Sequence, residues 1–194
     1  MKSDKDKSIK KLIVLSSPSG GGKTTVAHHL MNVFPDLKFS VSATTREKRK
    51  GEIHAKDYFF LSKEDFQQLI NNNGLVEWEE IYGNYYGTLR NEVENALNSK
   101  IYLLFDIDVK GAMTLRREYP DDSLLIFLAP PDLKTIENRL RKRATEDKEQ
   151  LEKRLERMKM EMEFQDKFDH VIINNVLEDT LIKAENIVRQ HIKE

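Results

Sequence analysis

The 194-residue sequence contains no cysteine, which excludes disulfide bonds, thiolate metal sites and cysteine nucleophiles. It also lacks any apolar run that approaches the length of a membrane span. The N-terminal segment MKSDKDKSIKK has no hydrophobic core for secretion, and its acidic residues argue against an organellar transit peptide. We therefore expect residues 1–9 to form a flexible tail and the protein to be cytoplasmic.

The chain has almost no excess charge of either sign, since its formal net charge is −1. This balance gives no general attraction to nucleic acid or to membranes, and we expect neither as a partner. Hydrophobic residues make up 39% of the sequence and charged residues 34%, a composition typical of a soluble, highly charged globular protein. The length suits one core with a small inserted lobe.

Residues 12–25, LIVLSSPSGGGKTT, combine a short apolar run, a glycine-rich break and the start of an amphipathic stretch. A strand, a glycine-rich loop, Lys-Thr and a helix in this order are typical of a phosphate-binding P-loop. Glycines let backbone N–H groups converge on a phosphate, and the helix N-terminus adds partial positive charge there. We expect Lys23 to bridge the β- and γ-phosphates of a nucleotide and the Thr24 hydroxyl to ligate Mg²⁺.

Ser17 departs from the strict P-loop pattern, which has glycine five residues before Gly22. Because Ser17 precedes Pro18, it favours an extended conformation, and an extended residue does not require glycine. The alternative interpretation is a glycine-rich turn followed by a chance Lys-Thr pair. The strand before the loop and the helix after it favour the P-loop.

The other apolar segments predict an α/β fold with buried strands and a small sheet-containing lobe inserted after the second strand. Residues 62–65 resemble a capping box that begins a helix. The expected strands cover residues 12–15, 37–42, 58–60, 75–81, 85–87, 101–105, 124–128 and 170–173, and a C-terminal helix covers residues 181–192.

Residues 46–56 are rich in cationic side chains and contain few large apolar residues. One interpretation is a solvated basic loop. The segment follows a predicted strand in a chain that has a phosphate loop, so a second anion site for an acceptor is comparably favoured. Residues 139–157 also allow two interpretations. Their arginines fit a solvated helix, and they fit a flap that closes over phosphates.

Two carboxylates are candidates for the site. Glu77 lies between the apolar Val76 and Trp78 on a predicted strand, where a partly buried carboxylate needs a donor partner such as the two adjacent donors of a guanine edge. Asp106 follows the buried strand 101–105, where a P-loop enzyme holds Mg²⁺ directly or through water. A strand that ends in an acid is common, so only its pairing with the P-loop favours metal binding.

Over about residues 10–190 the chain resembles guanylate kinase. The resemblance rests on the joint order and spacing of SSPSGGGKTT, SVSATTREKRKGE, DYFF, EWEEIYGNYYGT, DIDVKGA, and RLRKRATED followed by KRL. It implies phosphoryl transfer from MgATP to GMP, giving ADP and GDP, with dGMP as a second acceptor, as a step in purine nucleotide metabolism. It also implies a P-loop three-layer α/β core with a parallel sheet (residues 10–40 and 95–194), a mixed β lobe that binds GMP (about 41–94) and a helical lid (about 139–155).

The resemblance further implies roles for the residues that match the family's motifs. ATP would contact Ser17, Pro18, Ser19, Gly20, Gly21, Gly22, Lys23, Thr24, Thr25 and, at adenine, Asn174. The GMP phosphate would contact Arg46, Arg49, Tyr58 and Tyr86, and guanine would contact Ser42, Glu77, Thr88 and Asp108. The catalytic cations would be Lys23, Arg46, Arg139, Arg143 and Arg154, with Mg²⁺ near Thr24 and Asp106.

Ala55 and Ala144 stand where the family usually has glycine, and these substitutions could alter the mobility of the loop and the lid.

Two alternatives to a guanylate kinase stay open at this point. One is another P-loop kinase of nucleotides or small metabolites, and the other is a guanylate-kinase-like interaction module that has lost catalysis. The sequence also leaves open whether the protein is a monomer or a homodimer.

Overall fold

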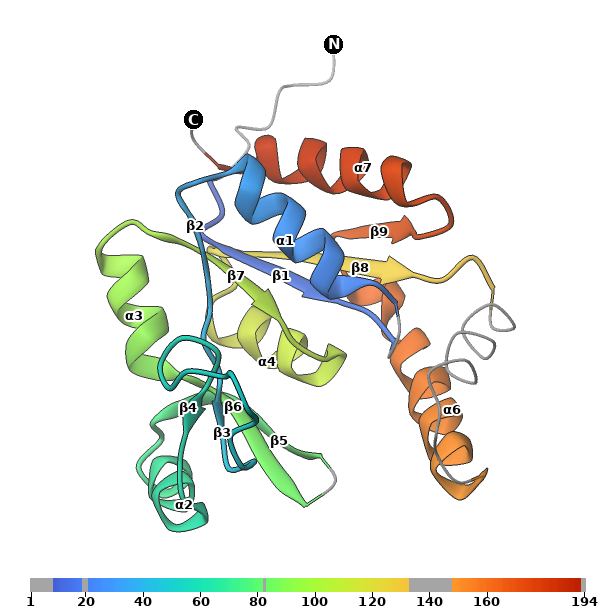
Figure 1. Ribbon diagram of the computed structural model, residues 1–194. Helices are drawn as coiled ribbons and strands as arrows, with labels where there is room; N and C mark the ends of the chain where they lie inside the picture. The colour runs from blue at the N-terminus through green and yellow to red at the C-terminus, as the bar shows by residue number, and fades with distance from the viewer. Residues whose placement is uncertain (1–8, 19–20, 82, 133–147, 193–194) are drawn as a thin grey trace.

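The computed structural model describes residues 9–18, 21–81, 83–132 and 148–192. These residues form two β-sheets with helices around them, and the larger sheet lies beside the smaller one (Figure 1). Within the described residues, no helix has the length and apolar character needed to cross a membrane.

The larger sheet has five parallel strands in the order β2-β7-β1-β8-β9. Every residue of β1 and β8 is buried, as expected for central strands of a parallel sheet that is covered on both faces. The strands are β1 (Leu12–Ser16), β2 (Leu37–Phe39), β7 (Tyr102–Asp106), β8 (Ser123–Ala129) and β9 (His170–Ile173).

Helices cover both faces of this sheet and complete a three-layer core (Figure 1). On one face, α1 (Lys23–Val33) and α7 (Leu177–Arg189) pack through residues such as Leu30 and Val188. On the other face, α3 (Arg90–Asn98) and α4 (Val109–Glu118) pack through residues such as Val93 and Leu115. The α/β fold with a parallel sheet that the sequence predicts is therefore confirmed.

The smaller sheet is mixed, in the order β4-β3-β6-β5, with β3 and β4 parallel and the other pairs antiparallel. Its strands are β3 (Ala43–Thr44), β4 (Phe59–Phe60), β5 (Leu75–Ile81) and β6 (Asn84–Leu89). Phe66 of α2 (Lys63–Asn71) is fully buried against this sheet and stacks on Tyr85. Because β5 also packs against α4, the smaller sheet is held beside the carboxyl edge of the larger one.

After β8, the described chain resumes with α6 (Lys148–Met162), which projects past the carboxyl edge of the larger sheet (Figure 1). Met158 on this helix is buried. A short 3₁₀ turn (Gln165–Lys167) then leads into β9.

Two predicted elements differ from the observed ones by more than two residues at one or both ends. The strand predicted at 37–42 ends at Phe39 as β2, and after Ser40 bonds to Leu104 of β7 the chain crosses to the smaller sheet, where β3 begins at Ala43. The C-terminal helix begins at Leu177, four residues before the predicted start at 181. Glu178 and Asp179 lie in its first turn, where the helix dipole stabilises acidic side chains.

The capping box predicted at residues 62–65 is present and offers a test of stability. The Ser62 hydroxyl accepts a hydrogen bond from the Asp65 backbone N–H at 2.9 Å. We expect Ser62→Ala to lower the free energy of unfolding by about 1 kcal/mol, because a helix N–H loses its acceptor. Urea denaturation followed by circular dichroism measures the change, with the exposed Ser99→Ala as control. A Ser62→Ala variant as stable as the wild type would contradict this role.

Candidate active site

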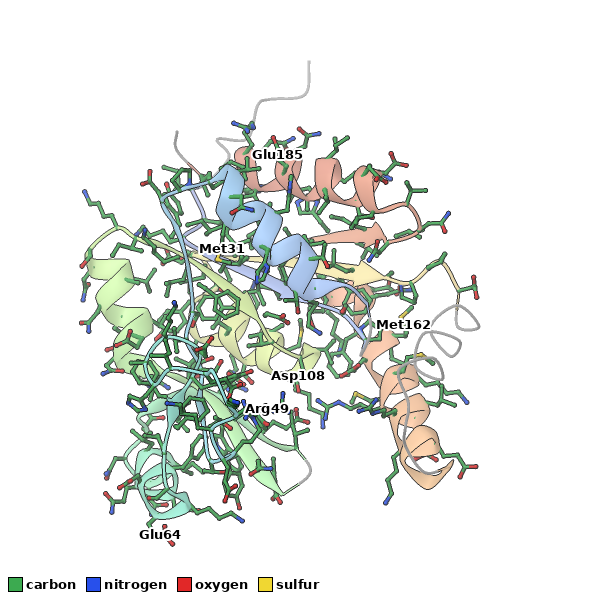
Figure 2. The ribbon with its side chains drawn as sticks, viewed as in Figure 1. Met31, Arg49, Glu64, Asp108, Met162 and Glu185 are labelled. Atoms are coloured by element: carbon green, nitrogen blue, oxygen red, sulfur yellow. The ribbon has the colours of Figure 1, made fainter. Side chains whose placement is uncertain are left out.

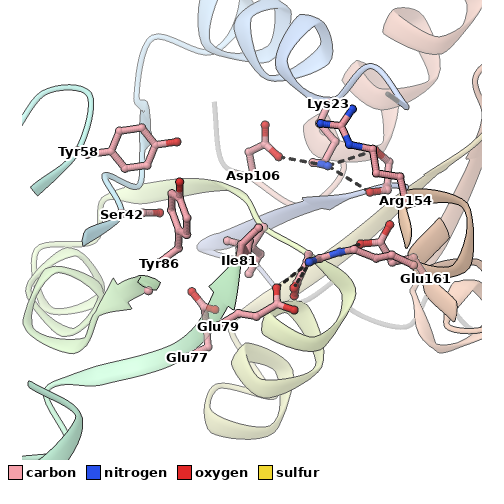
Figure 3. A pocket seen from close by; sticks show the side chains of 15 residues that line it. Lys23, Ser42, Tyr58, Glu77, Glu79, Ile81, Tyr86, Asp106, Arg154 and Glu161 are labelled. Carbon is pink, nitrogen blue, oxygen red and sulfur yellow. Dashed lines mark hydrogen bonds and ion pairs between the residues drawn. The ribbon is translucent and has the colours of Figure 1, made fainter. Parts of the chain in front are cut away.

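A cavity of about 350 Å³ opens where the carboxyl edge of the larger sheet, the smaller sheet and α6 come together (Figure 3). Sites in open α/β folds form at this edge because the carboxyl ends of parallel strands meet there. Of the residues predicted from the sequence, those that line the cavity are Ser17, Lys23, Ser42, Tyr58, Glu77, Tyr86, Asp106, Asp108 and Arg154.

Lys23 begins α1 directly after the glycine-rich loop and points toward the end of β7 (Figure 3). Gly22, the residue before it, has a φ of 90°, a left-handed conformation that favours glycine. The Lys23 ammonium donates to the Ser17 carbonyl at 3.1 Å and lies 3.7 Å from the Asp106 carboxylate. The loop lysine and the acid at the strand end therefore meet, as the P-loop interpretation predicts.

Ser17 is accommodated in the loop because residue 21 has no side chain. Ser17 is 2% exposed, and a Cβ atom on Gly21 would lie 2.4 Å from its hydroxyl oxygen. The Ser17 hydroxyl donates to the Pro18 carbonyl at 3.0 Å. The serine and Gly21 thus share a space that two side chains could not both occupy.

Asn174 supports the same loop from the end of β9. Its side-chain amide N–H donates to the Gly21 carbonyl at 2.7 Å, and its amide oxygen accepts from the Thr180 hydroxyl at 3.1 Å. Asn174 is 7% exposed. In this structure it holds the backbone of the phosphate loop, and its contact with adenine stays a prediction.

Arg46, Tyr58 and Tyr86 form a cluster on the smaller sheet. The Arg46 guanidinium donates to both carboxylate oxygens of Glu52, at 2.7 and 3.1 Å, and lies 5.3 Å from the centre of the Tyr58 ring. The hydrogen bond to Glu52 raises the pKa of Arg46. Glu52 also accepts a hydrogen bond from the backbone N–H of Arg49, which is an exposed residue. One carboxylate thus orders the turn that carries both arginines.

Glu77 and Thr88 face each other across the antiparallel pair β5 and β6. The Thr88 hydroxyl donates to the Glu77 carboxylate at 2.6 Å. Burial raises the pKa of the Glu77 carboxyl to about 7, and the negative charge of Asp108 acts in the same direction. In Figure 3 the Glu77 side chain points from β5 into the cavity, with Ser42 across from it.

Asp106 and Thr24 form a donor set suited to Mg²⁺. Burial raises the pKa of Asp106, and Lys23 and Thr24 oppose that rise through charge and hydrogen bonding. Among the described residues, no group of three or more His, Cys, Asp and Glu side chains is arranged to hold a metal ion by itself. Mg²⁺ commonly binds one or two carboxylates together with substrate phosphates, so one carboxylate and one hydroxyl fit an ion that arrives with a nucleotide.

Comparison with known proteins shows the family to which the chain belongs. The guanylate kinase family model matches residues 9–191. The chain belongs to the guanylate kinase family. The guanylate kinase of Chlorobium luteolum is 50% identical over 173 residues, which is 89% of this chain and 88% of the relative. That of Salinibacter ruber is 45% identical over 182 residues, 93% of this chain and 96% of the relative.

A solved structure agrees with the family assignment. The crystal structure of guanylate kinase from Anaplasma phagocytophilum superposes with a TM-score of 0.76 at 33% identity. The alignment covers 97% of this chain and 89% of that structure. The likeness to guanylate kinase that the sequence motifs indicate is therefore confirmed over nearly the whole chain.

Not every predicted residue of this guanylate kinase family member is placed in the cavity. Thr25 is exposed on α1, and Arg49 is exposed on the connection between β3 and β4. Thr88 reaches the cavity only through its hydrogen bond to Glu77. Ala55 has a φ of 61°, which explains why the family usually has glycine there. Predictions for Ser19, Gly20, Arg139, Arg143 and Ala144 lie outside the described residues.

Three charged residues that the sequence did not single out also line the cavity: Glu79, Arg157 and Glu161. Glu79 could have been found, because side chains two positions apart on a strand share a face and Glu77 was already a candidate. Arg157 carried no such signal. Its partners Glu79 and Asp108 lie far from it in the sequence.

The raised pKa of Glu77 leads to a testable effect on stability. The folded chain binds this proton more tightly than the unfolded chain, so the contribution to stability is fully present below the ordinary value of 4.5 and is lost as the pH rises through about 7. Glutamine does not titrate. We therefore expect Glu77→Gln, relative to the wild type, to become progressively more stable between about pH 5 and about pH 8.

Urea denaturation across this pH range, without nucleotide, measures that difference. Glu80→Gln, which changes an exposed carboxyl on the same strand, is the matched control. A stability difference between Glu77→Gln and the wild type that does not vary with pH would contradict the effect of burial on Glu77.

Proposed function

We propose that this chain transfers the γ-phosphoryl group of ATP to GMP, giving ADP and GDP, with dGMP as a second acceptor. The observation that carries the proposal is that one cavity is lined by a phosphate-loop lysine, Lys23, and by a half-buried carboxylate, Glu77, suited to a guanine edge. Relatives up to 50% identical are named guanylate kinase, which supports it. The chain is an ATP-dependent kinase of purine nucleotide metabolism.

On the donor side, the loop amides and Lys23 bind the phosphates of ATP. The loop precedes α1, whose N-terminal N–H groups and dipole favour phosphate at this point. Lys23 exchanges its contact with the Ser17 carbonyl for the β- and γ-phosphate oxygens. The full set that we propose for ATP is residues 17–25, with Asn174 close to adenine.

Mg²⁺ is the cofactor that we propose, held by Thr24 and Asp106 together with ATP. When bound, it neutralises charge on the phosphates during transfer. The Asp106 carboxylate lies at the carboxyl end of β7, beside the loop, where Lys23 and Thr24 lower its pKa against the effect of burial. Its position beside Lys23 suits an ion that arrives with the phosphates.

On the acceptor side, Arg46 and Arg49, with the hydroxyls of Tyr58 and Tyr86, bind the phosphate of GMP. No catalytic base is required, because the second ionisation of a phosphate monoester lies near pH 6 and the attacking oxygen is already largely deprotonated at pH 7. The chemistry then depends on alignment and on neutralising charge. Lys23 and Arg154, which both line the cavity, supply that charge.

Further cations come from the lid. We propose that Arg139 and Arg143, within a lid of about residues 139–155, contact the transferring phosphates together with Arg154.

The same proposal divides the rest of the chain into a core (10–40 and 95–194) and a GMP-binding lobe (about 41–94), with residues 1–9 as a tail. A cytoplasmic location and a monomeric or homodimeric state stay predictions.

Guanine is selected by Glu77, with Ser42, Thr88 and Asp108 around it. Guanine offers N1–H and N2–H₂ as adjacent donors to a carboxylate, whereas adenine has an acceptor at N1. A mismatched base leaves buried polar groups unpaired, at a cost of about 1–3 kcal/mol or more. Thr88 holds one Glu77 oxygen in place and leaves lone pairs of the carboxylate for the base.

An interaction module without catalysis is the main alternative from another class. It is less favoured because Lys23 and Asp106 lie together at the loop, an arrangement that such a module has no reason to keep. A kinase of another nucleoside monophosphate is the alternative within the same class. Glu77 and its neighbours, and the relatives named guanylate kinase, argue against it.

A coupled assay of ADP formation with Mg²⁺, ATP and each of GMP, dGMP, AMP, CMP and UMP tests the proposal. We expect turnover with GMP, less with dGMP, and little with the others. Folded protein that forms no ADP in response to GMP would overturn the enzyme interpretation, and a preference for AMP would overturn the assignment of Glu77.

Lys23→Ala provides a test of the donor site. We expect kcat to fall by at least about 100-fold, because a cation is removed from the transferring phosphate in a partly enclosed site. The exposed Lys38→Ala is the control. Unfolding in urea establishes that Lys23→Ala remains folded, and near-normal turnover by the folded variant would contradict the role of Lys23.

Glu77→Gln provides a test of the acceptor site. Gln retains one oxygen for Thr88 but places an amide N–H₂ or a weaker acceptor before guanine N1–H and N2–H₂. We expect KM for GMP to rise about 10- to 100-fold and KM for ATP to change little. With Glu80→Gln as control, equal losses for the two nucleotides would rule out a role specific to guanine.

A further inference from the structure

Arg157 of α6 contacts three carboxylates that come from three different elements. Its guanidinium donates to Glu79 of β5 at 2.7 Å, to Asp108 at the start of α4 at 3.1 Å, and to Glu161 of α6 at 3.0 Å. Dashed lines in Figure 3 mark the contact at Glu79, which joins α6 to the smaller sheet.

The Asp108 carboxylate is held at both of its oxygens. One oxygen accepts from the Gly111 backbone N–H at 2.7 Å and caps α4, and the other accepts from Arg157. In Figure 2 the Asp108 side chain lies between the two sheets, facing the side of α6. Each oxygen has a second lone pair, so the carboxylate can still accept from a base edge.

When both are ionised, Glu79 and Asp108 would repel each other without the guanidinium between them. Their side chains are 24% and 18% exposed, so solvent screens them only in part. Burial, and then the neighbouring Asp108, raise the pKa of Glu79 to about 7, while Arg157 acts in the opposite direction. Arginine suits this place because its planar group stays charged and can bind several oxygens at fixed angles.

The same cluster lies beside Glu77, the residue that we propose reads the base. Glu77 is two positions before Glu79 on β5, and its carboxylate would lie 2.8 Å from a Cβ atom on Gly111, next to the Asp108 cap. A shift of Asp108 or β5 would therefore change the space and charge around Glu77. Arg157 is in a position to control both, because it binds Asp108 and β5 together.

We propose that Arg157 is a positioning residue of the acceptor site, which holds Asp108 and Glu79 in the arrangement that receives guanine. It does not touch the transferring phosphate in this role. The proposal rests on the GMP kinase function proposed above, and it adds a residue of α6 to the guanine side of the site.

The experiment compares Arg157→Ala, Arg157→Lys, Glu79→Ala and the double variant Glu79→Ala/Arg157→Ala in the wild-type background. Both GMP binding, by calorimetric titration, and steady-state turnover are measured. We expect Arg157→Ala to raise Kd and KM for GMP about tenfold or more, since it leaves two close carboxylates without their cation. KM for ATP should change less than about twofold, and Arg157→Lys should restore only part of the affinity.

The double variant separates positioning from general damage. Removing Glu79 as well relieves the repulsion on Asp108, so we expect the double variant to bind GMP more tightly than Arg157→Ala alone. Arg189→Ala is the control, since Arg189 makes the same type of pair with Glu185, four residues before it on α7, away from the cavity. If Arg157→Ala does not fold, Arg157→Lys and Glu79→Ala still test the proposal through their GMP affinity.

Two failures can be told apart. Wild-type protein that binds GMP but forms no ADP would overturn the proposed kinase function. An active wild type whose Arg157→Ala variant keeps the wild-type Kd for GMP, or loses GMP and ATP affinity equally, would overturn the role of Arg157.

Discussion

The parallel pairing of β1 with β7 is the contact on which the site depends. Its register sets Leu15 beside Asp106, so the strand that enters the phosphate loop and the strand that ends in an acid finish at the same level. Lys23 then needs only the turn at Gly22 to come within 3.7 Å of the Asp106 carboxylate. Burial of every residue of β1 keeps this register in place, because a slip would expose apolar side chains or bury polar ones.

The acceptor side is built on a different principle. Here burial raises the pKa values of Glu77 and Glu79 to about 7, and the nearby carboxylate of Asp108 acts in the same direction. Such groups oppose folding above neutral pH, yet a guanine edge with two donors requires a desolvated acceptor. The proposed selectivity for guanine therefore competes with stability at Glu77. The Thr88 hydroxyl reduces the cost of burying Glu77, and Arg157 reduces the cost of burying Glu79.

Features that depend on neighbours in sequence were predictable. The capping residue Ser62, the strand Leu75–Ile81 and the order strand, loop, lysine, helix at the phosphate site all follow from local patterns. The strand predicted at residues 37–42 was wrong in extent, because nothing local reveals that the chain leaves one sheet for another after Phe39. Helices α3 and α4 had no prediction, although they complete the core.

The sequence by itself determined which groups are available for the proposed chemistry: a phosphate loop with its lysine, an acid at a strand end, and arginines and a carboxylate that we propose bind the acceptor. These residue types and their spacing are visible without coordinates, and they sufficed to indicate the family. Only the tertiary structure decided why Ser17 fits beside Gly21, and that Arg157 joins Glu79 to Asp108. Both depend on the shape of a shared space and on contacts between distant segments, which folding alone brings within hydrogen-bonding range.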